Sequence, residues 1–150
     1  MIIEVFGEPN SGKSNFVVND YIKDDDIVLY VDLDNKLLNE YVRNNMLLYY
    51  PKTAEDLYDT LLELKEDIDT LVIDSLPMLI SKDGTVYKTL AMIQKIISYC
   101  RRNKINVVLV NQYRYKNNGL ATYGYKRLGI YYNTRICVES DNIKIIKGTL

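Results

Sequence analysis

No part of the sequence restricts the possible architecture as strongly as the stretch from Gly7 to Ser14, which reads Gly-Glu-Pro-Asn-Ser-Gly-Lys-Ser. It matches the pattern G-x-x-x-x-G-K-[ST], follows the apolar run 2–6, and precedes residues 13–22, which suit a helix. The glycines allow the backbone to turn successive N–H groups inward, and the start of the helix adds the positive end of its dipole. The sequence therefore predicts a strand, a tight turn and a helix that together bind phosphate groups.

The same pattern assigns roles to individual residues of this turn. Lys13 is expected to reach the β- and γ-phosphates of a nucleoside triphosphate, and Ser14 is expected to supply a hydroxyl to Mg²⁺. The alternative is a glycine turn with an incidental lysine. The residues predicted to bind the nucleotide here are Gly7, Glu8, Pro9, Asn10, Ser11, Gly12, Lys13, Ser14 and Asn15.

Acidic residues follow two other apolar runs. Asp74 closes the run 70–74, which predicts a second contributor to the Mg²⁺ site beside Ser14, although an aspartate at a strand end can also cap a turn. Cleavage of a phosphate also needs a group that orients or deprotonates water, and Asp34, just past the run 27–31, is the preferred candidate. Asp32 competes for this role, and both residues could serve only to keep a loop soluble.

Short apolar runs alternate with segments of helical spacing along the chain. The predicted strands are 2–6, 27–31, 46–50, 70–74 and 106–111, and the predicted helices are 13–22, 36–44, 54–67 and 86–103. Residues 81–84 and 112–128 are predicted loops, and residues 134–148 form a predicted antiparallel hairpin. Strands that are apolar throughout indicate a mostly parallel sheet covered by helices on both faces. We expect an α/β fold in one domain over residues 1–150.

Composition excludes several kinds of site. The sequence contains no histidine, which excludes Ser-His-Asp and Cys-His catalysis and every zinc site that needs imidazole. Its two cysteines, Cys100 and Cys137, are far apart in sequence and are expected to be reduced, apolar groups. The first ten residues lack a charged leader segment and the chain has no long apolar run, which predicts a cytoplasmic protein with no membrane partner.

The charges are distributed unevenly although the formal net charge is only −1. Residues 19–86 hold 16 acidic and 6 basic side chains, whereas residues 101–138 hold 8 basic and no acidic ones. The second region could attract a phosphate backbone. For Arg101, Arg102 and Lys104, near the end of a long predicted helix, compensation of the helix dipole is the favoured role.

The segment from Tyr113 to Arg127, YRYKNNGLATYGYKR, combines cations with tyrosines. Single-stranded nucleic acids are bound by cations along the backbone and aromatic rings under the bases. A mobile soluble loop or a subunit contact would have a similar composition. The residues predicted to bind DNA are Tyr113, Arg114, Tyr115, Lys116, Tyr123, Tyr125, Lys126 and Arg127.

Taken in order, these motifs resemble the RecA/RadA recombinase family across nearly the whole chain. GEPNSGKS is similar to the phosphate loop of that family, and YVDLD (30–34) is similar to the segment that carries its catalytic carboxylate. TLVIDSLPML (70–79) resembles the second acidic motif, and VVLVNQYR (107–114) resembles the Asn-Gln strand end that senses the γ-phosphate. The stretches GIYYNTRICVE and IKIIK are similar to the closing hairpin.

The resemblance implies a RecA-like P-loop ATPase core that uses ATP and Mg²⁺, binds single-stranded DNA, and acts in DNA recombination, repair or replication. Lys13, Asp34 and Gln112 would be the catalytic residues, with Asp34 in place of a glutamate. Gln112 would couple the γ-phosphate to the loop that follows it. Tyr41 falls where bacterial members place an aromatic ring against adenine.

The sequence also departs from the family. Aspartate is one methylene shorter than glutamate, the chain begins at its first core strand, and the loop 81–85 is short. We therefore expect a truncated paralogue, of the kind found in viruses and archaea, rather than a full recombinase. Its partners would be a second copy, a recombinase or a replication protein. The alternative function is an ATP-gated accessory module with little hydrolysis; a small-molecule kinase is disfavoured because no arginine-rich lid is evident.

Overall fold

The computed structural model describes residues 1–34, 42–113, 121–140 and 142–148, in which seven strands form one sheet. The strands are β1 (Ile2–Gly7), β2 (Val28–Asp32), β3 (Met46–Tyr49), β4 (Thr70–Asp74), β5 (Asn106–Gln112), β6 (Thr134–Glu139) and β7 (Asn142–Lys147). Their order is β3-β2-β4-β5-β1-β6-β7, and every pairing is parallel except that of β6 with β7. The predicted fold class, including the C-terminal antiparallel hairpin, is confirmed.

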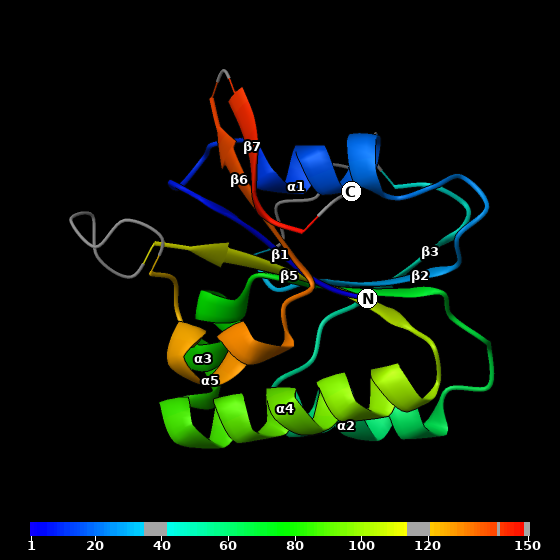
Figure 1. Cartoon of the computed structure of the whole chain (residues 1–150). Coiled ribbons are helices and arrows are strands. Elements are labelled where there is room, and N and C mark those ends of the chain that lie inside the picture. Colours follow the sequence, from blue (N-terminus) through cyan, green and yellow to red (C-terminus); the bar gives the residue numbers. More distant parts are fainter. Residues whose placement is uncertain (35–41, 114–120, 141, 149–150) are drawn as a thin grey trace.

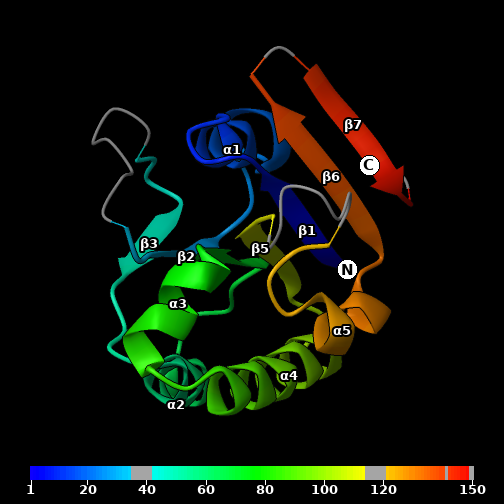
Figure 2. The same cartoon turned by 90° about the vertical axis from the view of Figure 1, so that its left-hand side faces the viewer.

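Helices cover both faces of this sheet (Figures 1 and 2). On one face lies α1 (Lys13–Phe16), which continues into the π-helix η1 (Val17–Tyr21). The other face carries α2 (Ala54–Glu63), α3 (Leu76–Asp83), α4 (Val86–Arg102), α5 (Tyr125–Leu128) and the 3-10 helix η3 (Gly129–Tyr131). Each face has its own apolar core, because β1, β2 and β4 bury their side chains on both sides. No helix in the described ranges has the length and apolarity needed to cross a membrane.

Helix α3 was not predicted, and the prediction of a loop at 81–84 is wrong for residues 81–83. The helix begins after Ser75, whose hydroxyl accepts a hydrogen bond from the Met78 N–H at 3.4 Å. Pro77 lies in the first helical turn, where its missing N–H costs no hydrogen bond. Gly84 ends the helix in a left-handed conformation with a φ of 71°. An apolar stretch that contains proline gave no helical periodicity, so only its caps could have indicated the helix.

Three further boundaries differ from prediction. Helix α2 ends at Glu63 rather than at residue 67, and residues 42–44 of the predicted helix 36–44 are not helical, while 36–41 lie outside the described residues. The predicted loop 112–128 contains helix α5, which begins after Gly124 in a left-handed conformation. In each case the local sequence is polar, and packing against neighbouring elements decides where the helix lies.

The register of the sheet brings polar strand ends to one edge. Gly7 at the end of β1 lies opposite Gln112 at the end of β5, and Asp32 at the end of β2 lies opposite Asp74 at the end of β4. Because these strands are parallel, their carboxyl ends meet at the same edge, where ligands of open α/β sheets bind. This edge holds the candidate site.

Candidate functional site

The two glycines of the turn between β1 and α1 are needed for different reasons. A Cβ atom on Gly7 would lie 2.2 Å from the carbonyl oxygen of Val138 on β6, so the close approach of a neighbouring strand excludes any side chain. Gly12 has a φ of 90°, in the left-handed region that favours glycine. The conformational role predicted from sequence therefore applies to Gly12, while Gly7 is required by packing against the sheet.

Lys13 begins α1 and lies over this turn. Its side chain is buried, and Nζ donates hydrogen bonds to the carbonyl oxygens of Glu8 at 2.6 Å and Gly7 at 3.4 Å. The Ser11 hydroxyl is also buried, and it has no hydrogen-bond partner among the described residues. The remaining residues of the predicted nucleotide site are exposed or, for Ser14, half-buried; the exposed ones are Glu8, Pro9, Asn10, Gly12 and Asn15.

Ser14 and Asp74, the two predicted Mg²⁺ ligands, lie in direct contact. The Ser14 hydroxyl donates to Asp74 Oδ2 at 2.5 Å, although the two residues are 60 positions apart in the sequence. The hydroxyl of Tyr30, which is fully buried in β2, donates to the same oxygen at 2.7 Å. Tyr30 was missed by the sequence analysis. Its signal was a tyrosine inside an otherwise apolar run, since a buried phenol hydroxyl usually has a hydrogen-bond partner.

Burial is the main cause that raises the pKa of Asp74 above its ordinary value. The negative charges of Asp32 and Asp34 raise this pKa further, whereas the hydrogen bonds from Ser14 and Tyr30 lower it. Within the described residues, no group of three or more His, Cys, Asp or Glu side chains is arranged to hold a metal ion. A cation at Asp74 would therefore need ligands from a bound molecule as well as from the protein.

Asp34 and Gln112, two of the three predicted catalytic residues, line one cavity of about 420 Å³. The cavity opens between β4, α3 and the end of β5, and its lining residues are Leu33, Asp34, Ser75, Pro77, Met78, Ser81 and Gln112. Asp32, the competing candidate, is 1% exposed and lies beside Asp74 in the sheet. Of the two aspartates, Asp34 is therefore the one that faces a space large enough for water and a phosphate group.

A second buried polar cluster, which we call the Glu4 network, consists of Glu4, Asn111, Thr122 and Arg135. Arg135 Nε donates to Glu4 Oε2 at 2.6 Å, and both side chains are almost completely buried. The Asn111 amide donates to Glu4 Oε1 at 2.8 Å, and the Thr122 hydroxyl donates to the same oxygen. This network was not predicted from the sequence, although a glutamate within the apolar run 2–6 was a signal for it.

The Glu4 network fixes both ends of the segment that follows β5. Asn111 Nδ2 also donates to the Tyr123 carbonyl at 2.8 Å, and Asn111 Oδ1 accepts from the Gln112 N–H at 2.8 Å. Tyr113 forms an isolated antiparallel bridge with Thr122. The two ends of this segment are therefore bonded to the strand ends that border the turn from Gly7 to Ser14.

The described residues predicted to bind DNA divide into two groups. Tyr113 packs its ring edge against Phe6, with ring centroids 5.5 Å apart, and its hydroxyl lies 3.1 Å from Cys137 Sγ. The other four line a groove of about 590 Å³ against the start of α4, and they are Tyr123, Tyr125, Lys126 and Arg127. Arg114, Tyr115 and Lys116, and also Tyr41, lie outside the described residues.

Two side chains of the groove already have partners. The Arg135 guanidinium lies over the Tyr125 ring, 4.3 Å from its centroid. Arg127 donates to Gln94 Oε1 at 2.6 Å and to the Tyr87 carbonyl at 3.3 Å. The bonds of Arg127 join α5 to α4, whereas the Arg135 contact joins α5 to β6. Among the four groove residues, Tyr125 and Lys126 are exposed and Tyr123 is half-buried.

No protein-family model matches the sequence, and no curated protein matches it. Among solved structures, the crystal structure of the RadB recombinase is similar, with a TM-score of 0.69 and a sequence identity of 16%. The similarity covers 91% of this chain and 73% of that chain. At this identity the comparison establishes the fold, which is RecA-like, and function has to be argued from the site itself.

Proposed function

We propose that this single-domain protein binds ATP with Mg²⁺ at the turn from Gly7 to Ser14. The observation that carries the proposal is the Ser14–Asp74 hydrogen bond of 2.5 Å, because it joins the hydroxyl that follows the turn to a carboxylate at a strand end. The turn suits an anion: Gly12 is left-handed, Lys13 lies over the turn, and the buried Ser11 hydroxyl has no partner among the described residues. Tyr41 remains our candidate for the adenine contact.

Ser14 and Asp74 are the residues that we propose to hold Mg²⁺, directly or through water. Mg²⁺ in such sites is typically bound by one or two carboxylates together with substrate phosphates, which agrees with a site that has too few acidic ligands by itself. When bound, the metal would neutralise negative charge on the phosphate oxygens. Tyr30 would keep Asp74 oriented by its hydrogen bond.

We propose that the protein hydrolyses the bound ATP, with Lys13, Asp34 and Gln112 as the catalytic residues. Asp34 would accept a proton from water as the water oxygen bonds to the γ-phosphorus and the bond from that phosphorus to the bridging oxygen breaks. Asp34 and Gln112 line the same cavity, which supports their acting on one substrate group. Lys13 would stabilise the charge of the γ-phosphate.

We further propose that single-stranded DNA binds along the segment 113–127 and that the nucleotide controls this binding. Tyrosines and cations border the groove against α4, as stacking and backbone contacts require. Gly7 and Gln112 are register neighbours, so a change at the phosphate turn can reach the start of the segment. The RecA-like fold shared with the RadB recombinase supports a role in DNA recombination, repair or replication, with a second copy or a recombinase as partner.

The test measures ATP binding and turnover on the full chain. Wild-type protein should bind a fluorescent ATP analogue only with Mg²⁺, and Lys13→Ala should weaken binding by about 100-fold or more. Asp74→Ala should remove the Mg²⁺ dependence, whereas Asp69→Ala, at an exposed carboxylate that directly precedes the other end of β4, is the matched control. Unchanged binding in Lys13→Ala would overturn the nucleotide site.

Hydrolysis and DNA binding are tested together. ATP turnover should rise when oligo-dT is added, and the effect should weaken at higher salt because counterions are released on binding. Tight Mg-ATP binding without turnover would instead favour the ATP-gated accessory module, and Asp34→Glu would then be expected to restore hydrolysis. This alternative rests on the aspartate at position 34, whose carboxylate reaches less far than that of glutamate.

A further inference from the structure

The outer face of α4 carries basic side chains that the proposed ATP and single-strand sites do not use. Lys88, Lys95 and Arg102 are seven residues apart, so they lie in one row along the helix, about 10 Å from each other. Ala91 and Ser98 lie between them on the same face. We call these five residues the α4 stripe.

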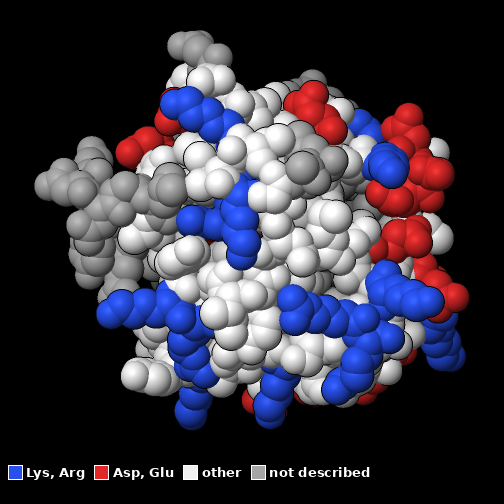
Figure 3. Space-filling view, in the orientation of Figure 1, with Lys and Arg blue, Asp and Glu red and all other residues white. Residues whose placement is uncertain are grey.

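The part of the sequence that carries the α4 stripe contains no acidic residue. No Asp or Glu occurs between Asp83 and Glu139, a stretch with ten Lys and Arg residues. Lys88, Lys95 and Arg102 are exposed, and none of them forms an ion pair with another described residue. Figure 3 shows Lys and Arg side chains in a row along the lower edge of the molecule, over α4 and α5, while most Asp and Glu side chains in view gather at the right.

Helix stability does not account for this arrangement. The dipole of α4 favours Arg101 and Arg102 at the last turn, but it disfavours Lys88, which lies in a first turn without any acidic residue. A basic residue against the dipole, in a row with two others, indicates a ligand rather than an intrahelical role.

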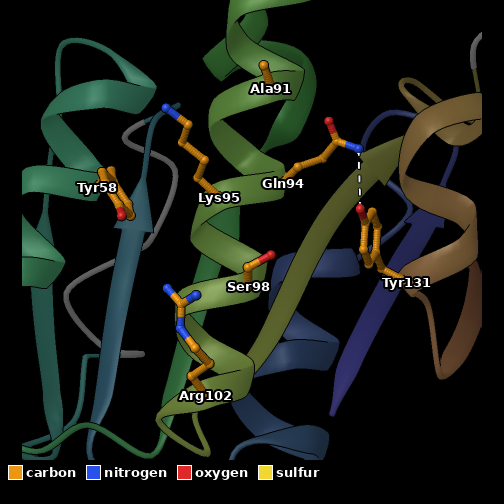
Figure 4. Close-up of a pocket in the computed structure, with 7 residues that line it drawn as sticks. All are labelled: Tyr58, Ala91, Gln94, Lys95, Ser98, Arg102 and Tyr131. Carbon is orange, nitrogen blue, oxygen red and sulfur yellow. Dashed lines mark hydrogen bonds between the residues drawn. The ribbon is translucent and has the colours of Figure 1, made fainter.

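The small residues of the α4 stripe open a polar hollow of about 520 Å³ between α2, α4 and η3. In Figure 4, Lys95 and Arg102 extend toward the side of Tyr58, and Gln94 reaches across to the Tyr131 hydroxyl at 3.4 Å. Ser98 lies in the middle of the hollow with its hydroxyl exposed. Cations on one side and neutral donors on the other form a surface that suits a phosphate group.

We propose that the α4 stripe binds the sugar–phosphate backbone of a nucleic-acid duplex. Its three cations span about 21 Å of a straight helix, which corresponds to about six base-pair steps along the axis of a straight duplex. None of the five residues of the stripe is aromatic, so the stripe itself offers no ring for stacking of unpaired bases. Of the tyrosines beside it, Tyr131 has the Arg101 guanidinium over its ring, 5.3 Å from the centroid, and Tyr58 is in edge-to-face contact with Tyr99. This inference does not rest on the proposed ATPase activity.

The acidic side chains of α2 determine how the duplex would lie. Glu55, Asp59 and Glu63 are exposed on the helix beyond Tyr58 and would repel a polyanion from that side. The duplex would therefore run along α4 and lean toward Arg101, η3 and α5. An acidic protein or an anionic membrane would be attracted by the same cations, so both are tested as alternatives.

The experiment compares two triple variants of equal charge. Lys88→Ala/Lys95→Ala/Arg102→Ala removes the cations of the stripe, and Lys23→Ala/Lys52→Ala/Lys65→Ala removes three exposed cations from the acidic half of the chain. Binding of a labelled duplex of about 20 base pairs is measured without nucleotide between about 50 and 200 mM salt. The stripe variant should bind about tenfold more weakly or worse at low salt, and its log–log salt slope should fall by about 2 to 3. The control variant should keep most of the affinity.

A second variant distinguishes a loss of duplex binding from a loss of folding. Ser98→Glu adds one carboxylate to the floor of the hollow without touching the core, and it should also weaken duplex binding while thermal unfolding stays the same. Equal losses in both triple variants, or an unchanged salt slope, would overturn the proposal. A loss of single-strand binding as large as the loss of duplex binding would also overturn the proposal. Displacement of the duplex by poly-glutamate or anionic vesicles at equal charge concentration would overturn it as well. Mg-ATP binding should be unchanged in the stripe variant, so a failure of the duplex-binding proposal can be distinguished from a failure of the proposed ATP site.

Discussion

Two of the buried carboxylates among the described residues, those of Glu4 and Asp74, have different hydrogen-bond partners. Glu4 is bonded to a guanidinium of its own chain, at 2.6 Å from Arg135 Nε, and to two further donors. Asp74 accepts hydrogen bonds from two neutral hydroxyls, those of Ser14 and Tyr30, and it lies near two more carboxylates. The Glu4 network is complete as the chain folds, whereas Asp74 keeps a raised pKa that a bound cation would lower.

The difference indicates what each cluster is for. A buried ion pair with all its donors in place holds β1, β5 and β6 together at the root of the 113–127 segment. Asp74 is desolvated, and its hydrogen-bond partners among the described residues, Ser14 and Tyr30, are neutral. A buried carboxylate in such surroundings lowers the stability of the fold, and carboxylates with perturbed pKa values are concentrated at functional sites. The comparison predicts that removing charge has opposite effects in the two clusters.

The largest expected effect is that of Arg135→Met. This change leaves the Glu4 carboxylate buried without its guanidinium and removes the cation that lies over Phe6 and Tyr125. The free energy of unfolding, measured with urea, should fall by about 3–5 kcal/mol. The double variant Glu4→Gln/Arg135→Met should be more stable than the single one, since it removes the buried charge. A double variant that is no more stable would contradict the assignment of the cost to Glu4.

Next in size is Tyr30→Phe, which removes one of the two hydroxyls bonded to Asp74. Because the acceptor is a carboxylate, the free energy of unfolding should fall by about 1.5–3 kcal/mol. Tyr49→Phe is the control, since the Tyr49 hydroxyl is half-buried and bonds to the hydroxyl of Thr60 at 2.8 Å. Equal losses in the two variants would mean that the Tyr30 bond to Asp74 is not a charge-assisted one.

A smaller effect of opposite sign is expected for Asp74→Asn. The amide oxygen can still accept from Ser14 and Tyr30, while the buried charge and its repulsion by Asp32 and Asp34 are removed. The variant should be more stable than the wild type by about 1 kcal/mol in the absence of ligand, and Mg-ATP should no longer raise its melting temperature. Asp69→Asn, at an exposed site, should not be stabilised. Destabilisation by Asp74→Asn would show that the two clusters are alike.

The smallest effect concerns pH. Because the pKa of Asp74 is raised by burial, the native state binds more protons than the unfolded state from the ordinary range of aspartate, about pH 4, up through the raised value. The wild type should therefore lose stability relative to Asp74→Asn as the pH rises through this window, by a total no larger than the about 1 kcal/mol expected for the substitution itself. Urea titrations of both proteins across the window measure the difference. A difference that stays constant with pH would argue against a raised pKa.

Much of the architecture could be predicted from the sequence. The apolar runs at 2–6, 27–31, 70–74 and 106–111 are strands of one sheet, because a strand covered on both faces needs apolar side chains at every position. Helix α3 could not be found in this way, since its apolar residues surround a proline and show no period. Ser14 and Asp74 belong to two local patterns, the motif from Gly7 to Ser14 and the acidic end of the run 70–74. Each pattern can be recognised in the sequence without the other, and the structure brings the two side chains into contact.

What the amino-acid order alone determined is therefore local: the turn from Gly7 to Ser14 with its glycines and lysine, the alternation of strands and helices, and the acidic ends of strands. What the tertiary structure decided is which distant groups meet. Arg135 is 131 residues from Glu4, Thr122 is 118 residues away, and Tyr30 is 44 residues from Asp74. Strand order and register place these groups together. Neither can be predicted from the spacing of neighbouring side chains, because a local period indicates only which face of its own helix or strand a residue occupies.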